Sequence, residues 1–169
     1  MAKIISPSTP AHYCSIASLL HEYHQWCCDR YAGERNWEFK DYFNEVVWDH
    51  ELASLKKMYI PPTGEFLLAL QNSEPSGCIA FKQYSNTVCE VKRLFVLDKF
   101  RGQGIARQLV KHILEKAKIY NYKIARLEFG ELLVESKSLY TSMGFKNIEA
   151  YTDIPKRLKP KMEFMELQL

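Results

Sequence analysis

The pattern of apolar and polar positions divides the chain into a helical first third and a strand-rich remainder. A short apolar run at 3–5 predicts a strand. The Thr9-Pro10 pair after it is typical of a helix N-cap followed by proline at the first helical position. The residues that follow keep helical spacing, with apolar side chains at Ile16, Leu19, Leu20 and Tyr23. This period predicts one helix over 11–30 and a second over 38–57.

Beyond the Pro61-Pro62-Thr63-Gly64 stretch the period changes from helix to strand. Strands are predicted at 65–71 and 78–83, joined by a hairpin turn over 72–77. A third strand at 88–97 alternates less cleanly, which indicates deeper burial.

The last third alternates helix with strand. Its first helix has an apolar stripe that recurs every fourth residue, at Ile105, Leu109, Ile113 and Ala117. The remaining predicted elements are a strand at 125–129, a helix at 134–143, and strands at 146–151 and 162–167. The whole order predicts an α/β fold with a mixed sheet. The length of 169 residues allows one domain, 1–169, with a substantial core.

Charge and composition narrow the class of partner. A net charge of +3 gives no indication of nucleic-acid binding. The chain has no run of about 18 apolar residues and no apolar signal region after its first Met, so we expect no membrane span and a cytoplasmic protein. Five cysteines without a C-x-x-C pair indicate reduced thiols. His21, His24 and Cys28 share one helix face, but their spacing is not that of H-E-x-x-H, and we expect no metal.

The stretch RGQGIARQLV, which begins at Arg101, joins a predicted strand to a predicted helix. A dinucleotide fingerprint would place a small residue at position 107, which is Arg107, and a Walker loop would place Lys where Ile105 stands. Two readings remain. Backbone N–H groups at the helix N-terminus, approached closely at glycine, can bind an anion. Alternatively, the glycines form only a turn before a surface helix.

Four segments together resemble the GNAT superfamily of acetyl-CoA-dependent N-acetyltransferases. The R-x-x-G-x-A pattern ending at Ala106 is similar to the superfamily's R/Q-x-x-G-x-G/A signature. EVKRLFV at 90–96 is similar to its E-x-K-R-L-Y-V strand, and LYTSMGF at 139–145 to its L-Y-x-x-x-G-F segment. FMEL at 164–167 resembles its last strand. The resemblance implies a single GNAT-type domain, with a mixed, mostly antiparallel central sheet flanked by helices.

The resemblance also implies a cosubstrate, acetyl-CoA. Its pyrophosphate would be wrapped by the loop residues Arg101, Gly102, Gln103, Gly104, Ile105 and Ala106, with the dipole of the following helix behind them. Its pantetheine arm would lie against Leu94, Phe95 and Val96 like an added strand, which requires this strand to splay from its neighbour. No metal is implied.

Acetyl transfer needs a deprotonated amine, a stabilised oxyanion and a proton for the leaving thiolate. The resemblance implies that Glu90 is the base; the alternative is a strand carboxylate paired with Lys92 or Arg93. It implies that Tyr140 is the acid, a phenol that is protonated at neutral pH; the alternative is a core aromatic ring. It places a backbone N–H near Val96 at the oxyanion.

The sequence departs from the family pattern in two places. The usual Asn at the start of the penultimate helix is missing from 132–136, so that cofactor contact is not carried over, and the usual tyrosine of the strand is Phe95. Aromatic residues of the first two helices are candidates for the acceptor wall or for core packing: Tyr23, Trp26, Tyr31 and Trp37.

The predicted function is direct acetyl transfer, in a ternary complex, to a small-molecule amine or a peptide or protein amine. The alternative is a catalytically silent acyl-CoA sensor. A homodimer is left open.

Overall fold

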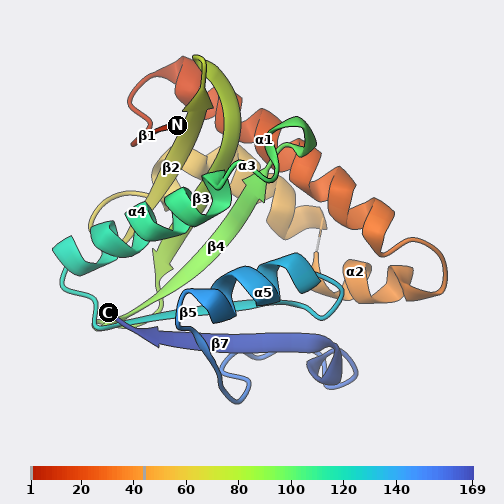
Figure 1. The fold of residues 1–169 in the computed structure, drawn as a ribbon. Coiled ribbons are helices and arrows are strands. Elements are labelled where there is room, and N and C mark those ends of the chain that lie inside the picture. Colours follow the sequence, from red (N-terminus) through yellow and green to blue (C-terminus); the bar gives the residue numbers. More distant parts are fainter. Residues whose placement is uncertain (1, 44) are drawn as a thin grey trace.

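The computed structural model describes residues 2–43 and 45–169. Its centre is a seven-stranded sheet in the order β1-β2-β3-β4-β5-β7-β6 (Figure 1). The strands are β1 (Lys3–Ile5), β2 (Gly64–Gln71), β3 (Glu74–Gln83), β4 (Val88–Val96), β5 (Ile124–Gly130), β6 (Lys146–Asn147) and β7 (Met162–Gln168). β4 and β5 run parallel, and the other neighbouring pairs are antiparallel. The prediction of a mixed, mostly antiparallel sheet is confirmed.

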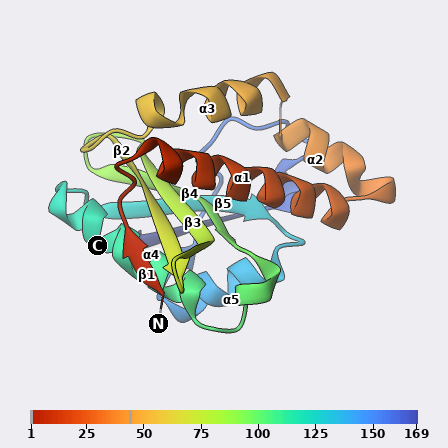
Figure 2. The same ribbon diagram turned by 90° about the horizontal axis from the view of Figure 1, so that it is seen from above.

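Helices cover both faces of this sheet. Figure 2 shows α1, α2 and α3 on one side, and α4 and α5 on the other. The helices are α1 (Pro10–Arg30), α2 (Asn36–Tyr42), α3 (Glu45–Met58), α4 (Ile105–Ile119) and α5 (Val134–Ser142), with short 3-10 turns at Gly33–Arg35, Asp98–Phe100 and Lys159–Lys161. The predicted N-cap is confirmed, because the N–H of His12 donates to Oγ1 of Thr9 at 3.3 Å.

The prediction of one helix over 38–57 is wrong. Phe43 leaves the helical backbone, with φ −94° and ψ 87°, and separates α2 from α3. Its buried ring packs between Phe39, with ring centroids 4.6 Å apart, and Trp48, at 5.5 Å. One straight helix could not turn both of these rings onto α1, so aromatic packing overrides the helical pattern of the sequence.

Two predicted strand boundaries also need correction. β3 begins at Glu74, because the hairpin turn consists of only Asn72 and Ser73, both with positive φ, 50° and 67°. The strand expected at 146–151 is reduced to Lys146–Asn147. After one further bond to β7, from the N–H of Ile148 to the Phe164 carbonyl at 2.9 Å, the chain leaves the sheet, and the hydroxyl of Tyr151 donates to the Glu90 carboxylate at 3.0 Å.

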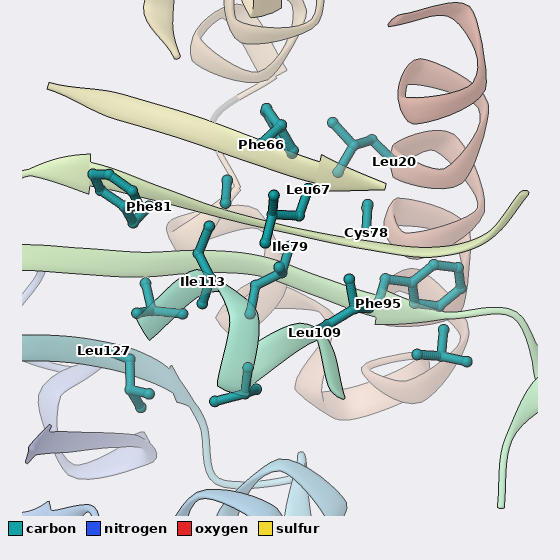
Figure 3. Packing of buried hydrophobic residues seen from close by; sticks show 14 of the residues in the cluster. Leu20, Phe66, Leu67, Cys78, Ile79, Phe81, Phe95, Leu109, Ile113 and Leu127 are labelled. Atoms are coloured by element: carbon teal, nitrogen blue, oxygen red, sulfur yellow. The ribbon is translucent and has the colours of Figure 1, made fainter. Parts of the chain in front are cut away.

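The core lies between the sheet and the helices on each face. Figure 3 shows α4 pressing Leu109 and Ile113 against Ile79 of β3, while Leu20 comes from α1 on the opposite side. The four-residue stripe predicted for α4 is confirmed, since all four of its side chains are buried. Full burial of a large aliphatic side chain contributes roughly 1.5–3 kcal/mol, so this stripe fixes the helix that follows the RGQG loop.

Candidate active site

β4 and β5 separate part of the way along the sheet. Their parallel pairing covers Val88–Glu90 against Ile124–Arg126, although the strands continue to Val96 and Gly130. A bulge in β4 accompanies the separation. Its register with β3 shifts by one residue between Phe95 and Lys92, and Arg93 has a left-handed φ of 59°. A bulge bends its strand and redirects side chains, and it leaves the far half of β4 without a strand partner on the β5 side.

A buried ion pair anchors this bulge to α3. The Arg93 guanidinium donates to both carboxylate oxygens of Glu51, at 2.8 and 2.6 Å, and the Tyr59 hydroxyl donates to the same carboxylate at 2.5 Å. Burial alone would raise the pKa of Glu51, but the adjacent guanidinium more than reverses this, so the pKa lies below its usual value. The Arg93 guanidinium also lies 4.9 Å from the centre of the Trp48 ring.

A cavity of about 450 Å³ occupies the gap between β4 and β5. Most of the predicted cofactor residues line it: Leu94, Phe95, Val96, Arg101, Gly102, Gly104, Ile105 and Ala106. Gln103 does not, and its side chain instead lies near Gln71 and the Lys99 carbonyl, at 3.5 and 3.4 Å. The chain thus brings the two predicted cofactor segments together, while their roles in binding remain predictions.

The RGQG loop has the backbone geometry that an anion site needs. Gly102 and Gly104 have φ of 75° and 76°, a left-handed conformation that side chains disfavour. Gly104 is the N-cap of α4, and the first backbone bond of the helix runs from the N–H of Gln108 to the Gly104 carbonyl at 3.1 Å. The N–H groups between them have no intrahelical acceptor, so they can donate to a phosphate with the helix dipole behind them.

Cationic side chains frame the same end of the cavity. The Nε of Arg101 donates to the Val96 carbonyl at 3.1 Å, and its guanidinium lies 4.9 Å from the centre of the Trp26 ring. Arg107 also lines the cavity and donates to Oγ of Ser142 at 2.7 Å. A diphosphate held by the loop would therefore meet two guanidinium groups as well as backbone donors.

Tyr140 of α5 lines the cavity and is also packed in the core. Its ring is 6.1 Å from that of Phe129 and 5.2 Å from that of Phe145, and the residue is 5% exposed. Burial raises the pKa of its phenol, so the hydroxyl stays protonated at neutral pH. No described residue forms a hydrogen bond with this hydroxyl, which leaves its proton available to a ligand.

Glu90 lies at the closed end of the gap and is absent from the cavity lining. Its carboxylate accepts from Lys92 Nζ at 2.8 Å and from the Tyr151 hydroxyl at 3.0 Å. The pairing with Lys92 that the sequence left open is therefore present, whereas Arg93 pairs with Glu51 instead. The role of Glu90 as base remains a prediction.

Sequence reasoning missed Glu128 of β5. Strand alternation places Leu127 and Phe129 on one face and Glu128 on the other, where it lines both the main cavity and an adjoining cavity of about 30 Å³. Its carboxylate accepts from Oγ1 of Thr152 at 2.5 Å and more weakly from the Tyr42 hydroxyl at 3.4 Å. Burial raises its pKa, against the opposing effect of the Thr152 hydrogen bond. The available signal was a second charged residue, after Arg126, on the half-buried face of this strand.

The predicted acceptor-wall aromatics fall into three places. Tyr23 and Trp26 line the main cavity, Tyr31 lines the small one, and Trp37 contacts Arg157, whose guanidinium is 5.0 Å from its ring. Glu135 and Ser136, at the start of α5 where the usual Asn is missing, also line the main cavity.

Two further expectations are that the protein holds no metal ion and that no segment spans a membrane. Within 2–43 and 45–169, no three His, Cys, Asp or Glu side chains are grouped so that they could hold a metal ion. Over the same ranges, no helix has the length and apolar character to cross a bilayer.

Comparisons with known proteins agree with this geometry. The sequence model of the acetyltransferase (GNAT) domain family matches residues 62–147. An uncharacterized N-acetyltransferase of Schizosaccharomyces pombe is 32% identical over 123 residues, which cover 72% of this chain and 74% of that protein. N-acetylaspartate synthetase of Rattus norvegicus is 33% identical over 109 residues, 63% of this chain but only 36% of the synthetase.

The fold has counterparts among solved structures. A PaiA N-acetyltransferase from Thermoplasma acidophilum, solved in complex with coenzyme A, superimposes with a TM-score of 0.72 at 18% identity. The superposition covers 100% of this chain and 99% of that one. The family model, the yeast relative and the shared fold lead to one conclusion: the chain belongs to the GNAT acetyltransferase family.

Proposed function

We propose that this protein transfers an acetyl group from acetyl-CoA directly to an amine in a ternary complex. The observation that carries the proposal is the single cavity through the β4–β5 gap. Its lining includes the glycine loop at Gly104, the part of β4 at Val96 that has no partner on the β5 side, and the phenol of Tyr140. A pyrophosphate on the loop and a pantetheine along β4 would bring the thioester into this gap.

The residues at the gap support a direct transfer. The amine, once deprotonated, attacks the thioester carbonyl. A β4 backbone N–H near Val96 stabilises the oxyanion, and Tyr140 donates its proton to the departing sulfur. Two carboxylates are candidates for the base: Glu90, which the sequence motif suggests, and Glu128, which lines the cavity.

The acceptor is a small amine or a peptide or protein amine. The name of the mammalian relative, N-acetylaspartate synthetase, adds amino acids to the candidates. The five cysteines form no disulfide with described residues, which supports the expected cytoplasmic location.

Thiol release from acetyl-CoA, measured against a panel of amines, tests the proposal. We expect amine-dependent release together with acetylated product detected by mass spectrometry. Calorimetric binding of acetyl-CoA without release for any amine would refute the transferase function and support a silent sensor. Tyr140→Phe is the matched control, because it removes the phenolic proton and keeps the ring.

A further inference from the structure

We propose that the acceptor is an alkylammonium with no carboxylate beside its amine, and that Glu128 binds this ammonium and takes its proton. The inference rests on the proposed acetyl transfer and adds the chemistry of the acceptor to it. It follows from the position of Glu128, the charge balance of the acceptor side, and the walls of the small cavity.

The position of Glu128 differs from that of Glu90 in one decisive respect. The last paired residue of β5 is Arg126, opposite Glu90, so Glu90 lies where the strands are still joined. Glu128 is two residues further along β5 on the same face, inside the gap, and lines both cavities. Both oxygens of Glu90 already accept hydrogen bonds at 3.0 Å or less, whereas Glu128 has one such bond and one long contact of 3.4 Å.

The charges around the acceptor favour a cation. Each cation that lines the two cavities on this side already has a carboxylate partner: Lys92 with Glu90 at 2.8 Å, Arg93 with Glu51 at 2.6 Å, and Lys161 with Glu131 at 3.4 Å. Among described residues, Glu128 forms no ion pair, and its two partners are hydroxyl groups. An ammonium would neutralise this carboxylate, while an acceptor carboxylate would find no cation left to pair with it.

The small cavity also limits the shape of the acceptor. It adjoins the main cavity, shares Tyr23, Glu128, Phe129 and Leu133 with it, and measures about 30 Å³. Its other walls include the rings of Tyr42 and Phe43, and aromatic faces attract cations. A volume of about 30 Å³ has room for one water-sized group, so it can take the ammonium beside Glu128 but leaves no space there for a branch next to the amine.

The proton balance of the reaction can be written through these residues. The acceptor ammonium gives a proton to the Glu128 carboxylate, and the free amine attacks the thioester carbonyl to form a C–N bond. The tetrahedral intermediate collapses with cleavage of the C–S bond, and the Tyr140 phenol protonates the leaving sulfur. The second proton on nitrogen restores the phenol, and Glu128 releases its proton to water. The products are the amide, CoA thiol and one proton.

Pairs of amines that differ only by a carboxylate test the acceptor class. We expect kcat/KM at least about tenfold higher for phenethylamine than for phenylalanine, and for 1,5-diaminopentane than for free lysine reacting at its α-amine, because burial of an unpaired carboxylate is costly. The acceptor amine could belong to a protein lysine or to a small molecule. Comparing kcat/KM for the diamine with that for Nα-acetyl-lysine amide and for a lysine-containing peptide distinguishes the two. Preference for the carboxylated member of each pair, or for aspartate, would overturn the inference while leaving acetyl transfer intact.

Variants of the two carboxylates test the role of Glu128. Glu128→Gln should lower kcat/KM for the alkylamine about 10²-fold near neutral pH, with acetyl-CoA affinity unchanged, because a general base contributes on that scale. The control is Glu163→Gln, a carboxylate on the neighbouring strand β7 that pairs with Lys137 and lines neither cavity. A larger loss for Glu90→Gln than for Glu128→Gln would assign the base to Glu90 and overturn the inference.

A pH profile separates the base from a purely structural carboxylate. Glu128 is faced by Lys92 and Glu90 of β4, Tyr42 of α2, Tyr23 of α1 and Tyr151 of the loop between β6 and β7. The Glu128→Gln loss should shrink at high pH, where the acceptor has already lost its proton in solution. A loss of equal size at every pH would overturn the catalytic role. Absence of turnover with every amine in the wild-type protein would refute the proposed function itself.

Discussion

Replacing Gly104 by Val should remove acetyl-CoA binding and leave the fold in place. An ideal Cβ at Gly104 has no atom within 4 Å, so the fold itself has room for a side chain. The positive φ of 76° still disfavours valine, and its two methyl groups would stand where a phosphate must approach the free N–H groups of α4.

The expected loss of stability and the expected loss of acetyl-CoA affinity have different magnitudes. A β-branched residue held at positive φ costs about 1–3 kcal/mol, which for a chain of this length lowers the melting temperature by about 2–12 °C. A hydrogen bond to a charged group is worth about 1.5–3 kcal/mol, so loss of two phosphate contacts weakens binding about 10²- to 10⁴-fold. Isothermal titration calorimetry measures the affinity, and circular dichroism follows unfolding.

Gly33 provides a matched control. It has the same φ, 75°, and the same open space around an added Cβ, but it lies between α1 and α2 and lines neither cavity. Gly33→Val should lose comparable stability and bind acetyl-CoA normally. Near-native affinity in Gly104→Val would mean that the loop is only a turn, and equal weakening in both variants would mean that binding was lost through general destabilisation.

Three further predictions concern buried groups of the site. Tyr140→Phe should lower kcat by about 10²-fold or more with little change in acetyl-CoA affinity; an unchanged kcat would leave the ring a packing role only. Glu51→Gln should cost about 3–5 kcal/mol in urea unfolding, because Arg93 would lose its buried partner, and a loss below about 1 kcal/mol would contradict the anchoring role. The folded-state pKa of Glu128 is raised, so its stabilising contribution exists at low pH and disappears as pH rises through that pKa. The melting temperature of Glu128→Gln minus that of the wild type should therefore be larger at about pH 8 than at about pH 4. An equal difference at the two pH values would contradict the raised pKa.

The segments proposed to bind the cofactor could be predicted to lie together because their information is local. Two glycines next to a helix start specify the backbone of the loop from Arg101 to Ala106 within a few residues, and the proposed anion site needs only the backbone N–H groups of that loop. The position of Tyr140 at the cavity was predictable in the same way, from a short pattern on one helix, while its role as acid stays a prediction. The α4 stripe was predictable because its four-residue period depends on the helix alone.

The acceptor half could not be predicted, because its residues converge only in the folded chain. Tyr42, Glu128 and Thr152 come from α2, β5 and the loop between β6 and β7, and no sequence spacing relates them. The break at Phe43 that brings α2 over the sheet was itself a tertiary effect. Glu90 was visible from its motif, but its engagement by Tyr151 depends on where the chain goes after Asn147.

The bulge at Arg93 connects the two halves. The bulge redirects β4 at the point where pairing with β5 has ended, which opens the cavity. The side chain of Arg93 in the bulge donates to Glu51 on α3. β4 and α3 are therefore held together by one ion pair. Because the pair is buried, removal of either partner leaves an unpaired charge beside the cavity. A change at Glu51, which lines neither cavity, should thus disturb the strand on which we propose that the pantetheine binds, as well as the stability of the fold.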